Sequence, residues 1–200
     1  MYDLLFDEND FAEEINENKI FNNVILTKKD IAFKYFFNCR FISCIFSESM
    51  FRKLRFEKCI FTECDLSLVK LNQSSFIDVE FEESKLVGIN WTQLSNPALF
   101  VNFYKCIINY SVFLGKNLRK VRITECIAKE VDFSEADLTD AKCNLTDFSG
   151  SRFMNTDLTR TDFSGAMNYS INPQFNKLKK TVFSLPEAVS LLNGFDIILK

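Results

Sequence analysis

Every fifth residue of the chain is a large apolar one from Phe21 to Trp91, which gives fifteen successive positions in one register. A β-strand repeats every two residues and an α-helix every 3.6, so a period of five fits neither. The period instead predicts a supersecondary repeat in which each unit turns one large side chain inward. We therefore expect the chain to coil, with these central residues filling the coil.

A second position in each unit, two residues before the centre, holds mainly small or apolar residues such as Cys39, Ser49 and Val69. One large and one small inward residue per unit predict a core that is packed without room for a ligand.

The register slips by two residues between Trp91 and Phe103, and thirteen further centres follow from Phe103 to Phe163. Proline cannot donate to a strand ladder, and Asn-Pro favours a turn. We therefore predict a first coil over 21–91, a bulge or short loop over 92–102, and a second coil over 103–167. The loop residues are Ser95, Asn96 and Pro97.

The N-terminal segment 1–20 is acidic and loses the register at Asn16. A coiled solenoid needs a cap, because its end otherwise exposes apolar core and unpaired strand edges. We expect residues 1–20 to form the N-terminal cap.

The C-terminal segment 168–200 changes character. Ser184 and Glu187 form a capping-box pattern, which predicts a short helix that runs to about Asn193 and stops at Gly194, followed by a strand over 195–199. The apolar side chains of this segment are expected to cap the coil and to bind a second copy through whatever stays exposed. They are Leu185, Val189, Leu192, Phe195, Ile197 and Leu199.

Composition excludes several classes of function. The chain has no His, so it has no imidazole base, no Ser-His or Cys-His pair and no His metal ligand. The N-terminus lacks a basic signal-peptide region, and no apolar run reaches membrane-spanning length. We expect a cytoplasmic protein with reduced thiols that is not an enzyme and uses no cofactor.

Four cysteines, Cys39, Cys44, Cys59 and Cys64, could in principle supply four thiolates to zinc. Each one occupies the small inward position that Ser or Val fills in neighbouring units, so a column of small side chains explains their spacing without a metal. We therefore predict no metal site and no catalytic site.

The unit itself resembles that of the pentapeptide-repeat family: a small residue, a polar one, Phe or Leu, then two polar residues. Residues 136–140, 146–150 and 156–160 match it well. The resemblance implies an all-β, right-handed quadrilateral β-helix in which four units make one turn. Residues 20 apart would then stack at a strand spacing of ~4.8 Å. The sequence agrees, since Cys39 lies 20 residues before Cys59 and Phe21 lies 20 before Phe41.

Within that family, the segments 65–69, 86–92, 168–171 and 183–188 look like the topoisomerase-interacting branch of Qnr, MfpA and, most of all, AlbG. This resemblance implies a homodimer joined through its C-terminal ends. It also implies a protein partner, DNA gyrase or topoisomerase IV, which the protein would protect from quinolone- or albicidin-type antibiotics. Direct binding to nucleic acid or membrane is not expected.

Charge along the chain suggests where a partner would bind. Residues 31–91 sum to zero, whereas residues 130–165 sum to −5. We hypothesise that the acids of this last block imitate the phosphates of duplex DNA. They are Glu130, Asp132, Glu135, Asp137, Asp140, Asp147, Asp157 and Asp162.

Three alternatives remain open. An Asp before a centre can simply hydrogen-bond its own turn, which is compatible with mimicry because the group stays charged. The basic cluster of Lys116, Arg119, Lys120 and Arg122 can be a solvated face or a contact for an acidic protein. The whole chain can also be a scaffold for a different protein partner.

Overall fold

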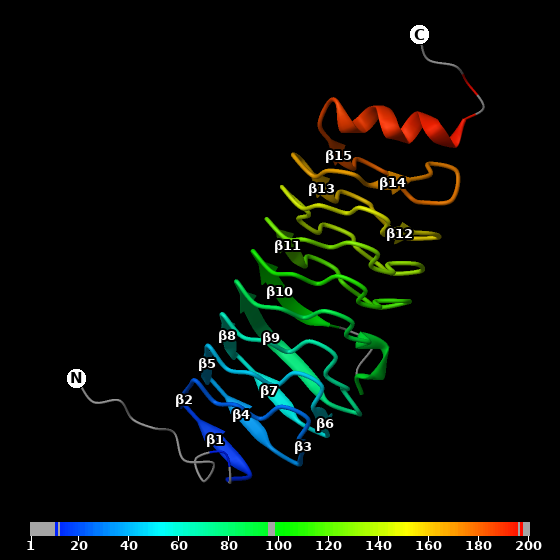
Figure 1. Ribbon diagram of the computed structural model, residues 1–200. Coiled ribbons are helices and arrows are strands. Elements are labelled where there is room, and N and C mark those ends of the chain that lie inside the picture. The colour runs from blue at the N-terminus through cyan, green and yellow to red at the C-terminus, as the bar shows by residue number, and fades with distance from the viewer. Residues whose placement is uncertain (1–10, 12, 96–98, 196, 198–200) are drawn as a thin grey trace.

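The protein is described by a computed structural model for residues 11, 13–95, 99–195 and 197. Its described part is a rod of short parallel strands stacked turn upon turn, with a helix across the C-terminal end (Figure 1). The strands are β1 (Ile15–Glu17), β2 (Ile20–Asn22), β3 (Asp30–Ala32), β4 (Tyr35–Phe37), β5 (Arg40–Ile42), β6 (Met50–Arg52), β7 (Arg55–Glu57), β8 (Ile60–Thr62), β9 (Ser75–Glu82), β10 (Phe100–Tyr104), β11 (Arg122–Thr124), β12 (Arg152–Phe153), β13 (Asp162–Phe163), β14 (Ser170–Ile171) and β15 (Val182–Phe183). Two 3₁₀ helices accompany them, η2 (Trp91–Gln93) and η3 (Glu187–Gly194).

The rod has four faces, which we number in chain order. Face 1 holds β2, β5, β8, the end of β9, β10, β11, β13 and β15. Face 3 holds β3, β6, β12 and β14, and face 4 holds β1, β4, β7 and the start of β9. Face 2 is joined by single bridges such as Ile25 with Ile45. β9 serves two faces because it runs around the corner, pairing with β7 and then with β8.

Neighbouring turns are offset by 20 residues, as predicted. Phe21 pairs with Phe41, and Phe41 with Phe61, all in parallel register. The predicted all-β coil with inward-facing centres is confirmed. Phe36, Phe41 and Phe61, for example, have no exposed surface.

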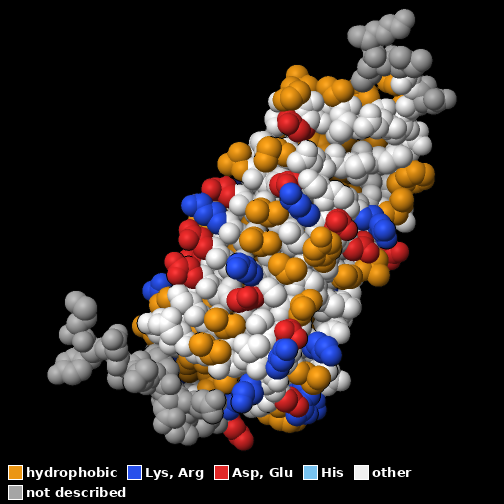
Figure 2. All heavy atoms as spheres, in the orientation of Figure 1, with side chains coloured by type: hydrophobic (Ala, Val, Ile, Leu, Met, Phe, Trp, Pro, Cys, Tyr) orange, Lys and Arg blue, Asp and Glu red, His pale blue; other side chains and the backbone are white. Residues whose placement is uncertain are grey.

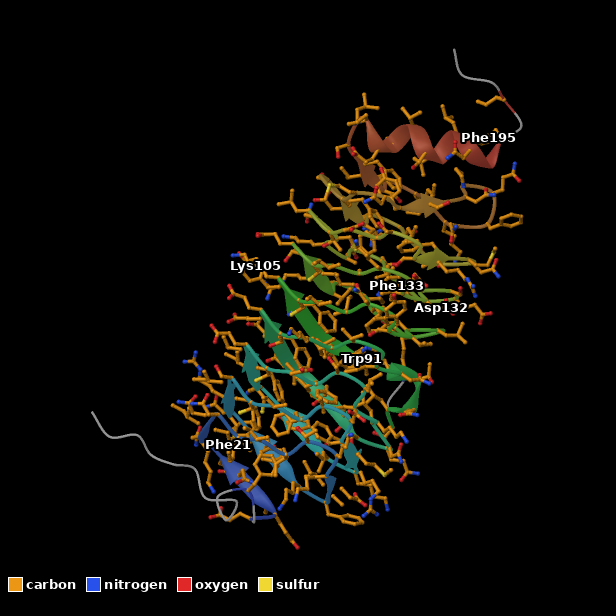
Figure 3. The ribbon with its side chains drawn as sticks, viewed as in Figure 1. Phe21, Trp91, Lys105, Asp132, Phe133 and Phe195 are labelled. Atoms are coloured by element: carbon orange, nitrogen blue, oxygen red, sulfur yellow. The ribbon has the colours of Figure 1, made fainter. Side chains whose placement is uncertain are left out.

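The inward aromatic rings stack along the rod axis. On face 1 the centroids of Phe21 and Phe41 are 5.0 Å apart, and those of Phe41 and Phe61 are 4.4 Å apart, with nearly parallel planes. On face 3 the ring of Trp91 stacks on that of Phe113 at 5.4 Å. Stacked aromatic pairs contribute about 0.5–1.5 kcal/mol beyond the area they bury, so the columns add directly to stability. Figure 3 shows Phe21, Trp91 and Phe133 inside the rod.

Residues at the small inward position donate hydrogen bonds to the backbone, which the sequence alone did not show. The Cys39 thiol donates to the carbonyl oxygen of Asn16 at 3.4 Å, and the Ser74 hydroxyl donates to that of Phe51 at 3.1 Å. Thr156 makes the equivalent bond to Phe133 at 3.0 Å. In each case the acceptor lies 23 residues earlier, at the centre of the preceding unit one turn below. A thiol or hydroxyl at this position therefore satisfies a buried carbonyl that would otherwise be costly.

The register slip lies inside one continuous stack. β9 pairs with β10 at an offset of 22 residues, with Phe81 opposite Phe103, and the pairing shifts between Phe100 and Val101. The two predicted coils thus share face 1 without a gap. Helix η2 begins the intervening segment, and the Asn90 side chain accepts a hydrogen bond from the Thr92 amide. Of the predicted loop residues, Asn96 and Pro97 lie outside the described residues.

Both ends of the coil extend further than the sequence suggested. Asn16, where the register was expected to fail, is fully buried, and β1 pairs it with Phe36. Its amide nitrogen donates to the Glu13 carbonyl, and its amide oxygen accepts from Lys19. At the other end β15 pairs with β13, so the coil continues to Phe183. The segments assigned to the two caps thus contribute strands to the coil.

The C-terminal helix forms, but not through the predicted capping box. The Ser184 hydroxyl accepts from the Gly165 amide at 2.9 Å, which ties it to the coil, and Pro186 is the N-cap without a side-chain bond. Gly194 is the last residue of η3 rather than a left-handed stop. A Cβ at Gly194 would lie 2.8 Å from the Asn172 side-chain oxygen, so glycine allows the helix end to approach the coil. Most of the predicted strand 195–199 lies outside the described residues.

This close approach predicts the effect of replacing Gly194 by Ala. Ala is the better helix former, so helix propensity alone predicts a gain in stability. The contact with Asn172 predicts instead a loss of about 1–2 kcal/mol, because the helix end must move away from the coil. Thermal unfolding of Gly194→Ala should show a lower Tm than the unmodified protein. Asn193→Ala, one residue earlier and exposed, is the control and should show no loss. Equal behaviour of the two variants would contradict the contact.

Candidate protein-binding surface

The eight predicted acids do not share a face. Asp162 lies on face 1, and Asp147 lies on face 2 beside Ile127. Asp132 lies on face 3, and Asp137 stacks under Asp157 on face 4. Figure 3 shows Asp132 and Lys105 projecting from opposite sides of the rod. The remaining members, Glu130, Glu135 and Asp140, are at turns that follow faces 2, 3 and 4.

Five of these acids bind their own turns. The carboxylate of each Asp accepts a hydrogen bond from the backbone amide two residues later. The donor amides are Ser134, Thr139, Ser149, Thr159 and Ser164, at 2.9–3.1 Å. The alternative reading, that these Asp residues stabilise turns, is therefore confirmed for Asp132, Asp137, Asp147, Asp157 and Asp162.

Four of the acids also have cationic partners. Asp137 pairs with Arg119 at 3.1 Å and Asp147 with Lys129 at 3.3 Å. Arg160 donates two hydrogen bonds to the Asp140 carboxylate, and Lys177 pairs with Asp157 at 3.1 Å. Arg119 is the member of the predicted basic cluster that neutralises one of these acids, and the other three cations, Lys129, Arg160 and Lys177, lie outside the cluster. Pairing lowers the net potential that the block from 130 to 165 presents to a partner.

Asp147 is the most strongly perturbed of the predicted acids. Its partial burial would raise its pKa, but hydrogen bonds from Ser149 and Asn168 and the ion pair with Lys129 together lower the pKa to about 2. The same balance of turn bonds and a cationic neighbour lowers the pKa of Asp137 and of Asp157. These three carboxylates are ionised at neutral pH, and each one already binds a cationic side chain and a turn amide of the protein.

Sequence reasoning missed a different group of acids. Five glutamates gather on face 1 and on the corner that follows it. We call them the face-1 glutamates: Glu63, Glu80, Glu82, Glu83 and Glu125. Summing charge along the chain hid them, because the basic residues that balance the segment 31–91 lie mostly on other faces. Summing the charges of residues 20 positions apart, which share a face of the rod, could have found them.

The face-1 glutamates are less neutralised than the predicted acids. Glu80 binds Arg122 at 2.7 Å, and Glu83 lies 3.9 Å from Lys105. Within the described part of the chain, Glu63, Glu82 and Glu125 form no ion pair. Figure 2 shows acidic side chains along one edge of the rod. This corner is therefore the more strongly negative surface.

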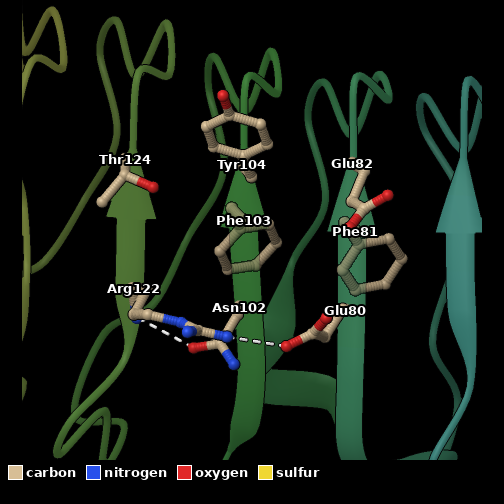
Figure 4. Close-up of a pocket in the computed structure, with 8 residues that line it drawn as sticks. All are labelled: Glu80, Phe81, Glu82, Asn102, Phe103, Tyr104, Arg122 and Thr124. Atoms are coloured by element: carbon tan, nitrogen blue, oxygen red, sulfur yellow. Dashed lines mark hydrogen bonds and ion pairs between the residues drawn. The ribbon is translucent and has the colours of Figure 1, made fainter.

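A shallow hollow lies among these residues on face 1 (Figure 4). Its walls are the side chains on either side of the buried centres Phe81 and Phe103, and its volume is about 210 Å³. Arg122 reaches across the face to Glu80, while its backbone amide donates to the Asn102 side-chain oxygen at 3.0 Å. Glu82 and Tyr104 line the other side. Ligand pockets usually measure roughly 300–1,000 Å³, so this hollow suits a side chain of a partner better than a free ligand.

The cysteines are fully occupied by packing. All seven are buried, and the six at small inward positions bond to backbone carbonyls. Complete burial raises the pKa of Cys143, which keeps its thiol protonated. Among the described residues no group of three or more Cys, Asp or Glu side chains could hold a metal ion. In the same part of the chain, no helix is long and apolar enough to cross a membrane.

The predicted dimer residues form an apolar surface at the C-terminal end. Leu185 is 78% exposed, and Val189, Leu192, Phe195 and Ile197 are also exposed. Leu191, on the other side of η3, packs against the core. Leu199 lies outside the described residues. The exposed set is available to a second copy, and dimerisation stays a prediction.

Comparison with known proteins gives two family matches. The model described as "pentapeptide repeat region" matches residues 34–96, and that described as "pentapeptide repeats (8 copies)" matches residues 117–153 and 132–167. No curated protein matches the chain significantly.

Solved structures are similar to the chain at low sequence identity. Full-length QnrB1, a plasmid-mediated fluoroquinolone resistance protein, is 19% identical with a TM-score of 0.50, over 92% of this chain and 100% of its own. HetL, involved in heterocyst differentiation regulation in the cyanobacterium Nostoc sp. strain PCC 7120, is 16% identical with a TM-score of 0.46, over 88% of this chain and 89% of its own. At this identity, the likeness to QnrB1 shows the fold alone.

The lowered pKa of Asp147 predicts a pH-dependent contribution to stability. Since its pKa is lower in the folded than in the unfolded chain, the contribution is present above about pH 4 and is lost as the pH falls towards 2. Asp147→Asn should cost about 0.5–1 kcal/mol at neutral pH, because the pair with Lys129 is lost. The difference in Tm between the two proteins should shrink as the pH falls from 5 towards 2. A difference that stays constant over that range would contradict the assignment.

Proposed function

Because the chain belongs to the pentapeptide-repeat proteins, we propose that it acts by binding another protein and performs no chemistry of its own. Its partner is a type II topoisomerase, DNA gyrase or topoisomerase IV, and binding modulates poisoning of that enzyme by quinolone- or albicidin-type antibiotics. The negatively charged corner beside face 1 carries this proposal, since a DNA-binding enzyme presents a basic surface.

Two further observations support the proposal. The rod has the fold of QnrB1, which is a fluoroquinolone resistance protein. Its inward positions are filled by side chains, and the hollow on face 1 is shallow, so the outer surface is the part of the molecule that can recognise a partner.

The charge density of this surface sets the expected strength of binding. Duplex DNA carries one negative charge per ~1.7 Å of its axis. The five face-1 glutamates, offset by Lys105 and Arg122, leave three net charges over four turns, or about one per 6 Å at ~4.8 Å per turn. The surface thus reaches about a quarter of the charge density of DNA. Binding should be electrostatic and should weaken as salt rises.

The contact groups are better sought among the face-1 glutamates than among the acids of residues 130–165. Glu63, Glu83 and Glu125 lie along a single corner, with Lys105 between the last two, whereas the predicted acids are spread over four faces. Asp137, Asp147 and Asp157 are also each bound to a cation and to a turn amide. A partner that used those three would have to displace existing ion pairs.

One observation favours the alternative of a scaffold for a different protein. The surface carries many ion pairs between turns, such as Arg52 with Asp30 and Arg160 with Asp140, so its charge is largely balanced outside the face-1 corner. A partner that recognises the shape of the rod or its apolar side chains would fit such a surface as well as a partner with a basic surface would.

Gyrase supercoiling measured with purified protein, with and without a quinolone or albicidin, tests the proposal. Three charge-matched triple variants separate the surfaces: Glu63→Gln, Glu83→Gln and Glu125→Gln on the face-1 corner; Asp137→Asn, Asp147→Asn and Asp157→Asn; and Glu13→Gln, Glu14→Gln and Glu17→Gln at the N-terminal end. We expect the first variant to lose at least about tenfold in effective concentration, which corresponds to ~1.4 kcal/mol. The third should behave like the unmodified protein.

The outcomes distinguish the hypotheses. Loss of the effect only in the Asp variant would restore the block from 130 to 165 as the contact surface. Equal loss in all three would indicate net charge rather than a site. No effect of the unmodified protein on supercoiling or on drug poisoning, at low or high salt, would contradict gyrase as the partner and favour the scaffold.

Dimerisation through the C-terminal end is tested separately. Phe195 and Ile197 are 44% and 53% exposed on the apolar end surface. Replacing both by Asp should give a monomer by light scattering, because four buried charges at the interface would lack partners. As a control, Lys180→Asp, on an exposed turn of the last coil, should leave the oligomeric state unchanged. If the dimer persists in the double variant, the interface lies elsewhere.

A further inference from the structure

Face 2 carries an outward column of alternating chemistry. Single parallel bridges connect Ile25, Ile45, Asp65, Lys85, Ile107 and Ile127 in that order, one residue per turn of the rod, and the column continues with Asp147 and Met167. Two isoleucines lie on each side of one acid and one base. In the space-filling view, hydrophobic side chains run up the rod between isolated charges (Figure 2).

Three of the four isoleucines between Ile25 and Ile127 are exposed, and Ile107 is half-buried. Ile25 is 64% exposed, Ile127 is 40% exposed and Ile45 is 36% exposed. Isolated apolar side chains on a surface need no explanation, but an aligned series over several turns marks an interaction surface.

The charged members of the column are available to a partner. Asp65 and Lys85 are bridged neighbours on adjacent turns, yet within the described residues neither forms an ion pair. The Asp65 carboxylate accepts one hydrogen bond among the described residues, from the Ser67 amide to Oδ1 at 2.9 Å, which leaves Oδ2 available to a partner.

Over the part from Ile25 to Ile127, the order of the column is complementary to its own reverse. Read from either end, this part gives two isoleucines, a charged residue, the opposite charge, and two isoleucines. If a second rod lies antiparallel against face 2, with the two-fold axis between Asp65 and Lys85, each Asp65 faces Lys85 of the second copy. Ile45 then faces Ile107, and Ile25 faces Ile127.

Other arrangements of two such faces are disfavoured. In a parallel pair, Asp65 would face Asp65 and Lys85 would face Lys85, and like charges placed opposite each other are destabilising. An antiparallel pair displaced by one turn would set a charge against an isoleucine and bury it without a partner. Of the two neighbouring turn columns, one places Lys28, which pairs with Glu48 of its own chain at 3.5 Å, opposite Glu130 of the second copy, and the other places Glu63 opposite Glu83. The register is therefore set by the central pairs of Asp65 with Lys85.

We propose that face 2 is a self-association surface on which a second copy of this chain docks antiparallel, with Asp65 of each copy paired to Lys85 of the other. This contact is separate from the apolar C-terminal end and does not depend on the proposed topoisomerase partner. If the C-terminal contact also forms, the two interfaces together link the rods into larger assemblies.

The size of the contact predicts a weak association. The six stacked residues from Ile25 to Ile127 are separated by five spacings of ~4.8 Å and so span about 24 Å along the rod. A face about 15–20 Å wide would then bury about 400 Å² per copy, against roughly 800 Å² for a standard stable interface. The dimer should therefore depend on concentration, forming at tens to hundreds of micromolar protein.

A charge-swap experiment tests the pairing. Sedimentation velocity would be recorded for chains carrying Phe195→Asp and Ile197→Asp, so that the C-terminal contact is absent, at about 5–300 μM protein. Asp65→Lys alone and Lys85→Asp alone each set like charges opposite one another and should weaken association about tenfold or more. The combined Asp65→Lys and Lys85→Asp variant reverses every pair and should restore association to within about threefold.

Controls keep the result interpretable. Lys70→Asp changes the same residue type at the same place in its unit on face 3 and should leave association unchanged. Circular dichroism would verify that each variant is folded, and if Asp65→Lys is not, Ile45→Glu with Ile107→Lys provides a second reciprocal pair. The proposal is overturned if the chain stays monomeric over the whole range, which would leave face 2 to another protein. It is equally overturned if the single variants associate normally or if the reciprocal swap fails to restore association.

Discussion

The structure depends on a parallel backbone ladder that joins each residue to the one 20 positions later. Phe21, Phe41 and Phe61 occupy equivalent positions on successive turns, so their rings stack and exclude water. The ladder requires a sharp corner after every unit. At these corners the backbone takes a positive φ, for example +54° at both Lys53 and Lys58. This left-handed conformation is energetically unfavourable for L-amino acids other than glycine. Stacking and ladder bonds over many turns must outweigh that repeated cost.

The same ladder explains the choice of small residues inside the coil. Cys, Ser and Thr at this position donate to carbonyl groups of the turn below, as Cys39 does to Asn16 and Thr156 to Phe133. Where Val69 or Val121 stands instead, apolar contact replaces the bond. The cysteines therefore reflect a need for compact donors, and their spacing follows from the turn length rather than from a metal.

The side chains on the outside of the rod are arranged by the same ladder but interact with each other through charge and exposed apolar surface. Outward side chains are grouped by face and turn, so residues 20 or 40 positions apart become neighbours. Arg122 reaches Glu80 over 42 residues of sequence, and Asp65 lies beside Lys85 on face 2. A surface for a topoisomerase and a surface for a second copy can then occupy different faces of one rod, because each face has its own columns.

The sequence by itself determined the coil, its 20-residue turn, the inward centres and the slip before Phe103, because each follows from a strict local period. It also identified the helix near residues 187–194, although Ser184 bonds to the coil instead of capping it. Only the tertiary structure decided that Asn16 belongs to the stack, where a buried amide can bond to Glu13 and Lys19. It likewise decided that the acids of residues 130–165 are dispersed and paired while Glu63, Glu83 and Glu125 align. The reason is physical: charges act on their neighbours in space, and in a coil those neighbours lie one turn away rather than next along the chain.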